Sequence, residues 1–100
     1  MRPPRRAVRL SDTFFRDIEL ALGPVRGPDG QPSATDFLVL DLPVIVEHFA
    51  IDFDLLPEII EGFGAGRMLI SAGALVQAFA AYGLLVEDGA IELIGIEFEL

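Results

Sequence analysis

The stretch that decides the fold runs from Arg67 to Leu100 and reads RMLISAGALVQAFAAYGLLVEDGAIELIGIEFEL. Within it, Asp88-Gly89 lies between two apolar runs. Glycine readily takes the positive φ of a tight turn, so we predict a β-hairpin there. A second turn is expected at Ala72-Gly73. The stretch is therefore predicted to form three antiparallel strands, over residues 67–71, 74–86 and 90–100.

The residue patterns of the last two predicted strands indicate which faces need cover. Alternate residues of the last strand carry most of its apolar groups, so we expect them to face the core; they are Glu92, Ile94, Ile96, Phe98 and Leu100. The middle strand is apolar on both faces and is expected to be covered on both. The alternative for residues 74–85 is an alanine-rich helix, with Leu75, Phe79 and Tyr82 at helical spacing.

The chain before this stretch predicts one short strand followed by helices. Alternation over residues 7–10 favours a strand, and Ser11-Asp12-Thr13 supplies side-chain oxygens that can cap a helix start. That helix is expected to end at Gly23-Pro24, and a loop is expected over residues 27–32. The whole chain is thus predicted to be α+β, with an N-terminal strand and helices packed on a C-terminal antiparallel three-stranded sheet.

The middle of the chain leaves more than one solution open. Ser33-x-x-Asp36 has the pattern of a capping box and predicts a second helix. Pro43 disfavours helix at the residue before it. The chain therefore either ends one helix near Asp41 and starts another, continues as a kinked helix, or forms a buried strand over 37–42. We favour a helix over 43–49 whose apolar side consists of Val44, Ile45, His48 and Phe49.

The composition predicts more apolar surface than one small domain can hide. One hundred residues correspond to a single domain, 1–100, and 52% of them are hydrophobic. A chain of this size buries about two-thirds of its unfolded surface. We expect an exposed apolar face that is covered by a second copy or by another protein. The alternative is that alanine inflates the hydrophobic count.

Charge is distributed unevenly along the chain. Residues 1–26 hold six of the seven arginines and three acids, whereas residues 27–100 hold one arginine and thirteen acids. An acidic body repels phosphate backbones, which disfavours nucleic-acid binding by it. The basic arm at residues 1–6 is expected to be frayed.

The absence of cysteine fits a reducing cytoplasm. The most apolar run, Met68–Val86, holds too many small and polar residues to predict a membrane span.

Few residues carry the chemistry of a catalytic or metal site. His48 is the single histidine, and the sequence assigns it neither a nucleophile nor an orienting acid, so we expect a structural residue. Residues 52–61 are expected to form a turn and a short helix with carboxylates along a solvated edge, because the calcium-loop pattern fails at Pro57 and Phe63. The glycines of 62–66 favour a flexible joint over a phosphate loop. We therefore expect no metal and no cofactor.

Arg67 and Tyr82 are the two remaining candidates for a role on the sheet. Arg67 is the one cation of an acidic body. We expect it in a salt bridge, with Glu92 or Glu97 for instance, and the alternative is a functional role on the sheet face. Tyr82 is the single tyrosine and is expected to pack with its hydroxyl at the rim of the sheet.

The order of these elements and three short motifs resemble the RelE/ParE superfamily of bacterial toxins. The motifs are Gly66-Arg67-Met68-Leu69-Ile70, the aromatic Tyr82, and Asp88-Gly89 followed by alternating isoleucines to Ile96. The resemblance implies a strand, a pair of helices and three final strands. It also implies a cognate antitoxin-like small protein as partner and, in the ribonuclease branch, catalytic roles for Arg67 and Tyr82.

The chain departs from the ribonuclease branch in its charge. It contains no lysine, and Glu97 and Glu99 stand where that branch often has a histidine. The resemblance therefore favours a toxin that acts through protein–protein contacts, as the ParE-type branch does. Two other functions remain open, a homo-oligomeric structural protein of phage-like character and an acidic inhibitor that mimics nucleic acid.

Overall fold

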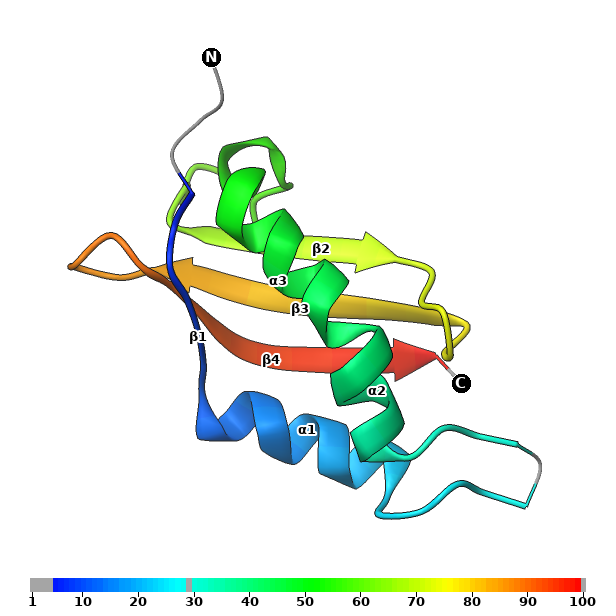
Figure 1. Cartoon of the computed structure of the whole chain (residues 1–100). Coiled ribbons are helices and arrows are strands. Elements are labelled where there is room, and N and C mark those ends of the chain that lie inside the picture. Colours follow the sequence, from blue (N-terminus) through cyan, green and yellow to red (C-terminus); the bar gives the residue numbers. More distant parts are fainter. Residues whose placement is uncertain (1–4, 29, 100) are drawn as a thin grey trace.

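Four strands form one mixed sheet in the computed structural model, which describes residues 5–28 and 30–99 (Figure 1). The strand order is β1-β4-β3-β2. The strands are β1 (Val8–Leu10), β2 (Gly66–Ser71), β3 (Ala78–Leu85) and β4 (Ile91–Glu99). The helical elements are α1 (Asp12–Leu22), α2 (Ala34–Leu40), α3 (Leu42–Ile51) and the 3₁₀ turn η1 (Phe53–Leu55). The α+β class is confirmed.

The sheet contains one strand more than the sequence predicted. β2–β3 and β3–β4 pair antiparallel as expected, but β1 adds to β4 in parallel, with Val8 opposite Ile91 and Leu10 opposite Leu93. A bare outer edge of β4 would leave backbone groups without partners. β1 covers the start of that edge, and farther along the Asp17 carboxylate of α1 accepts the Ile96 N–H at 3.1 Å. The predicted three-stranded antiparallel sheet is therefore present, but the prediction was wrong in leaving out a fourth strand, β1, which pairs in parallel.

The hairpin between β3 and β4 forms where the sequence predicted it. Gly89 has a φ of 85°, and Val86 N–H donates to the Ala90 carbonyl at 2.9 Å. β3 begins only at Ala78, so the turn expected at Ala72-Gly73 is a longer connection over 72–77. The helix alternative for residues 74–85 was wrong, because β3 pairs with a strand on each side.

A bulge in β4 reverses the faces predicted for its first half. The register of β3 against β4 shifts between Tyr82 and Gly83, which leaves Ile94 as an extra residue on β4. Glu92 and Ile94 were predicted on the core face, wrongly, and Leu100 lies outside the described residues. The core-facing residues of β4 are instead Ile91, Leu93, Ile96 and Phe98.

Local capping chemistry places the first two helices as predicted. Ser11 Oγ accepts the Phe14 N–H at 3.1 Å at the start of α1, and Gly23 follows its end with a φ of 71°. At the start of α2, Ser33 Oγ accepts the Asp36 N–H at 3.1 Å while the Asp36 carboxylate accepts the Ser33 N–H at 3.0 Å. This reciprocal pair is the predicted capping box.

The structure selects one of the three solutions for the α2–α3 region. α2 ends at Leu40, Asp41 separates the helices, and Pro43 lies in the first turn of α3. The Asp41 carboxylate is buried and accepts the backbone N–H groups of Ala74 at 2.7 Å and Leu75 at 3.2 Å. The helix junction therefore fixes the connection between β2 and β3.

The buried side of α3 was only half predicted. Ile45 and Phe49 are fully buried, as expected, but Val44 is 57% exposed and His48 also faces solvent. Apolar residues occur all round this helix, so its pattern does not identify the packed side. The remaining buried residues of α3 are Leu42 and Ala50.

Residues 52–61 contain less helix than predicted. Only η1 is helical, and beyond it the chain runs beside β2, where Met68 N–H donates to the Pro57 carbonyl at 3.0 Å. Glu58 and Arg67 form an isolated bridge at this edge. Pro57 lacks a backbone donor and cannot continue a helix, which explains the change to extended chain.

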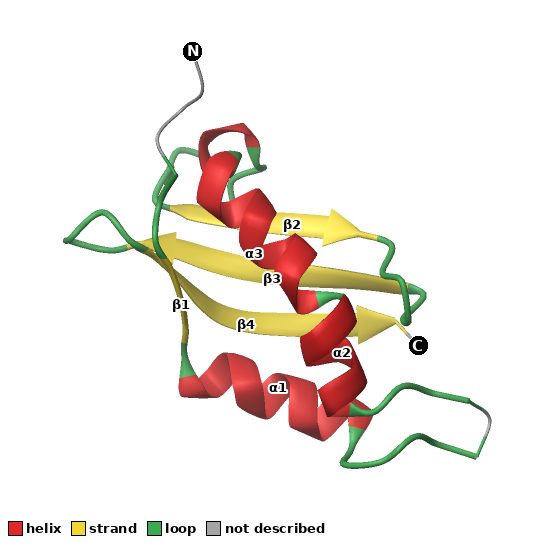
Figure 2. Ribbon diagram, viewed as in Figure 1, coloured by secondary structure: helices red, strands yellow, loops and turns green. Residues whose placement is uncertain are grey.

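The hydrophobic core lies between the sheet and the helices that cross one of its faces (Figure 2). Phe37 of α2 packs edge-on against Phe98 of β4, with ring centroids 5.0 Å apart. Gly83 makes room for α3, because a Cβ there would lie 2.6 Å from a ring carbon of Phe49. Within residues 5–28 and 30–99, no helix is long and apolar enough to cross a membrane.

Candidate functional site

Arg67 lies on the helix-covered face of the sheet and binds backbone carbonyls. Its Nε donates to the Gly64 carbonyl at 2.8 Å, and its Nη1 donates to the carbonyls of Leu56 at 2.9 Å and Asp54 at 3.3 Å. Its guanidinium carbon also lies 5.7 Å from the centroid of the Phe53 ring. The salt bridge predicted with Glu92 or Glu97 was wrong; Arg67 instead ties the segment around η1 to β2.

Tyr82 lies on the other face of the sheet. Tyr82 is opposite Met68 of β2, the immediate neighbour of Arg67, and successive residues of a strand point to opposite faces. Its hydroxyl donates to Glu97 Oε1 at 2.8 Å. This hydrogen bond, with burial and the Glu97 charge, raises the pKa of the Tyr82 phenol. The structure therefore does not bring Arg67 and Tyr82 together.

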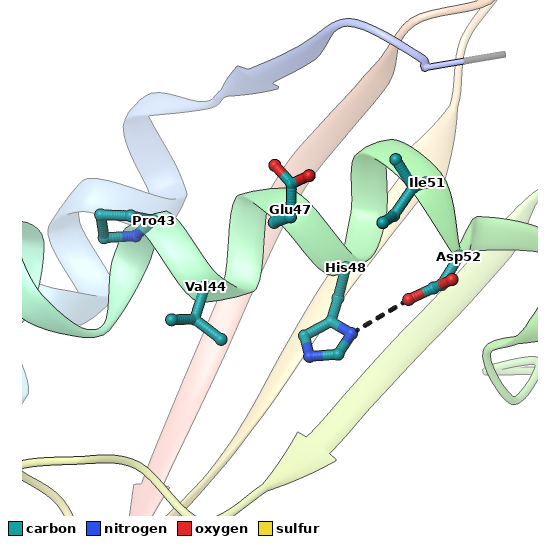
Figure 3. A pocket seen from close by; sticks show the side chains of 6 residues that line it. All are labelled: Pro43, Val44, Glu47, His48, Ile51 and Asp52. Atoms are coloured by element: carbon teal, nitrogen blue, oxygen red, sulfur yellow. Dashed lines mark hydrogen bonds and ion pairs between the residues drawn. The ribbon is translucent and has the colours of Figure 1, made fainter. Parts of the chain in front are cut away.

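His48 has an acid beside it on the exposed surface of α3. Its Nδ1 lies 3.3 Å from Asp52 Oδ2, one helical turn further along (Figure 3). The pair borders a hollow of about 360 Å³ that is lined by Pro43, Val44, Glu47, His48, Ile51 and Asp52. All of these residues belong to α3 or follow it directly, so the hollow is a groove along one helix and has no opposite wall.

The His48 region lacks the remaining parts of a nucleophilic site. Ser71 and His48 border the same smaller hollow between α3 and the 72–77 connection. Ser71 Oγ donates to the Ala72 carbonyl at 3.3 Å, and within the described part of the chain no hydrogen bond joins it to His48. A serine nucleophile requires a base within hydrogen-bond reach. Among residues 5–28 and 30–99, the half-exposed His48 therefore has an orienting acid but no nucleophile bonded to it.

The carboxylates of residues 52–61 do not gather into a metal site. Asp52 pairs with His48, and Asp54 receives a hydrogen bond from Arg6 at 3.3 Å. No group of three or more potential ligands forms among the residues that the structure describes.

The prediction of a frayed basic arm over residues 1–6 can be followed only in part. Residues 1–4 lie outside the described residues, whereas Arg5 pairs with Glu47 at 2.6 Å.

The sheet face opposite α2 and α3 is here called the open face. Neither α2 nor α3 crosses this face (Figures 1 and 2), and Ile70 on it is 64% exposed. Phe63, 49% exposed, extends it, because its ring lies within 3.3 Å of where a Cβ of Gly66 would be. From strands β2–β4, the open face carries Met68, Ile70, Ala78, Ala80, Tyr82, Leu84, Glu92, Gly95, Glu97 and Glu99.

One end of the open face has a shallow hollow. Across the strands, Ile70 of β2 is opposite Ala80 of β3, which is opposite Glu97 of β4. The small alanine leaves a hollow of about 210 Å³, lined by Ile70, Ala78, Phe79, Ala80, Glu97, Phe98 and Glu99. By the register of the strands, the methyl groups of Ala78 and Ala80 lie between Ile70 on one side and the carboxylates of Glu97 and Glu99 on the other. The sequence predicted that the Tyr82 hydroxyl lies at the rim of the sheet, but it did not predict Glu97 as its hydrogen-bond partner. The bulge decides which residues of β4 lie beside Tyr82, and the bulge was not predicted.

Comparison with protein-family models, with curated proteins and with solved structures found no match for this chain.

Proposed function

We propose that this chain acts through protein–protein contacts, as a toxin-module protein that forms a tight complex with a small antitoxin-like partner. The observation that carries the proposal is the open face, where Ile70 is 64% exposed with Phe63 beside it at 49%, and which neither α2 nor α3 covers within the described residues. Apolar side chains that are exposed together on one face are typical of surfaces that a partner protein covers. The proposal includes a cytoplasmic setting, which the absence of cysteine favours.

The order of elements supports the toxin-like form of this proposal. The chain runs from a strand through helices α1, α2 and α3 to three consecutive strands, which matches the strand–helices–three-strand outline that the resemblance to RelE/ParE-type toxins implies, with one helix more than the implied pair. The disposition of Arg67 supports action by contact rather than by RNA cleavage. Its Nε and Nη1 donate to three backbone carbonyls, and Tyr82 lies on the opposite face of the sheet.

The test is expression in a bacterial host with two readouts. Expressed alone, the chain is expected to slow growth. Co-expression with the small protein encoded beside it should restore growth and give one complex, whose native mass is measured by light scattering on a size column. The variant Met68→Asp/Ile70→Asp should lose the complex, because it places two charges on the open face.

A matched variant separates this surface from the rest of the molecule. Val44→Asp/Ile51→Asp places the same two charges on exposed positions of α3 and should leave the complex intact. A stable homo-oligomer without any effect on growth would contradict the toxin-like form and favour an assembly protein. A monomer that does not slow growth and does not bind the small protein encoded beside it would overturn the proposal entirely.

A further inference from the structure

We infer that the open face binds a basic, amphipathic segment of the partner protein, with an arginine or lysine side chain lying in the hollow between Ile70 and Glu97. This inference rests on the proposed function and adds the chemistry of the partner. It follows from the shape of the hollow, from the placement of acids around it, and from the poor fit of a second copy.

The hollow suits a side chain with an apolar stem and a charged head. Ala78 and Ala80 form a methyl floor, and Ile70 forms the apolar wall. Lysine and arginine cover apolar surface with their methylene stems while keeping the charge in a polar environment. A volume of about 210 Å³ is below the roughly 300–1,000 Å³ of sites for small molecules. The hollow therefore fits a single long side chain better than a cofactor.

The charged head would meet two carboxylates at the β4 wall. Glu97 and Glu99 are exposed and lie two residues apart on the same face, about 7 Å between Cα atoms by strand geometry. Tyr82 donates a hydrogen bond to Glu97, which holds one carboxylate in place before binding. Strands β2–β4 place no cation at this end, since their single arginine, Arg67, faces the helices.

A second copy of the chain fits this surface poorly. A two-fold dimer through the open face would bury Glu97 and Glu99 from both copies. Carboxylates taken out of water without a cation are strongly unfavourable. Among the arginines on the strands, Arg9 of β1 is the one that could neutralise Glu97 and Glu99. It lies at the far end of β4, however, and pairs with Asp88. A cationic partner supplies the missing charge.

The test uses a synthetic amphipathic peptide with arginine and leucine on one face and no aromatic residue, and a second peptide with glutamate in place of arginine. The chain has one tyrosine and no tryptophan, so tyrosine fluorescence reports Tyr82 alone, at the site itself. Only the arginine peptide is expected to bind. The affinity of the arginine peptide for the variant Glu97→Gln/Glu99→Gln should be lower by at least about tenfold, because the arginine loses charge partners that the complex would bury.

Matched variants separate a site from general attraction to an acidic protein. Glu19→Gln/Glu87→Gln removes two charges outside the open face and should change the affinity by less than roughly twofold. Ala80→Arg places a cationic side chain over the hollow and should abolish binding while far-UV circular dichroism remains unchanged. An equal loss in both double variants, binding of the glutamate peptide, or no binding at all would overturn the inference.

The two proposals fail in distinguishable ways. If Met68→Asp/Ile70→Asp abolishes the partner complex while Glu97→Gln/Glu99→Gln leaves it intact, the open face binds a partner of other chemistry, and the inference fails alone. If the complex survives both, the proposed function fails as well. If the chain dimerises through the open face and Ala80→Arg dissociates the dimer, a second copy is the occupant.

Discussion

Replacement of Arg67 by methionine separates a structural role of this residue from a catalytic one. Methionine keeps an unbranched apolar side chain over the Phe53 ring but removes every donor. The carbonyls of Gly64, Leu56 and Asp54 then lose their partner. We expect the segment around η1 to loosen from β2 and the whole domain to lose stability.

The size of the effect follows from the geometry. Two of the three hydrogen bonds are short, 2.8 and 2.9 Å, and the third is 3.3 Å and exposed. A hydrogen bond to a charged group contributes about 1.5–3 kcal/mol, and water replaces part of that at a half-buried residue. Arg67→Met should therefore lower the free energy of unfolding by about 2–4 kcal/mol, and the melting temperature by roughly 10–25 °C.

Urea denaturation followed by circular dichroism measures the effect. Arg26→Met is the matched control, because the Arg26 side chain is 75% exposed and an ion pair of an exposed side chain contributes little, so the stability of this variant should stay close to that of the unaltered chain. If the two variants had equal midpoints, the structural role of Arg67 would be refuted. A loss of biological effect in Arg67→Met without loss of stability would favour the catalytic role implied by the ribonuclease resemblance.

Three further changes test other parts of the structure. Asp41→Ala should cost about 2–4 kcal/mol in urea denaturation, because two backbone N–H groups of the β2–β3 connection lose a charged acceptor, and a cost below about 0.5 kcal/mol would contradict this. Gly83→Ala should cost about 1–3 kcal/mol, because its Cβ would clash with the ring of Phe49, and an unchanged midpoint would mean that α3 packs elsewhere. Glu97→Gln should lower the pKa of the Tyr82 phenol toward its ordinary value of about 10, as followed by phenolate absorbance. Since the folded state of the unaltered chain favours the neutral phenol, the stability from this pair should be complete below that pH and fall as the pH rises through the raised pKa; an unshifted titration in the variant would contradict the hydrogen bond.

The features that the sequence predicted correctly depend on neighbours within a few residues. The turn at Asp88-Gly89 needs only a residue that tolerates positive φ, and the capping box needs only Ser33 and Asp36. Both are therefore readable from a short window of sequence. The break between α2 and α3 was one of three solutions that the sequence left open, and the structure selects it, with Pro43 in the first turn of α3.

The features that the sequence did not reveal depend on contacts between distant segments. The bulge at Ile94 is set by packing across three elements, where Gly83 receives the Phe49 ring and Tyr82 lies opposite Gly95. Strict alternation cannot anticipate one extra residue, so half of the β4 face was assigned to the wrong side. For the same reason the sequence did not predict the carbonyls of Leu56 and Asp54 as partners of Arg67, because these residues are 11 and 13 positions away from it.

The parallel pairing of β1 with β4 also determines when the domain can complete its folding. Residues 8–10 are made early and their partners at 91–93 come about eighty residues later. During synthesis on the ribosome, the first strand therefore waits, unpaired, until β4 has been made. Closing so long a loop is slow compared with forming the β3–β4 hairpin. The nascent chain thus exposes the apolar side of β1 until β4 emerges, which is the interval in which a chaperone or a co-translated partner has most to gain by binding.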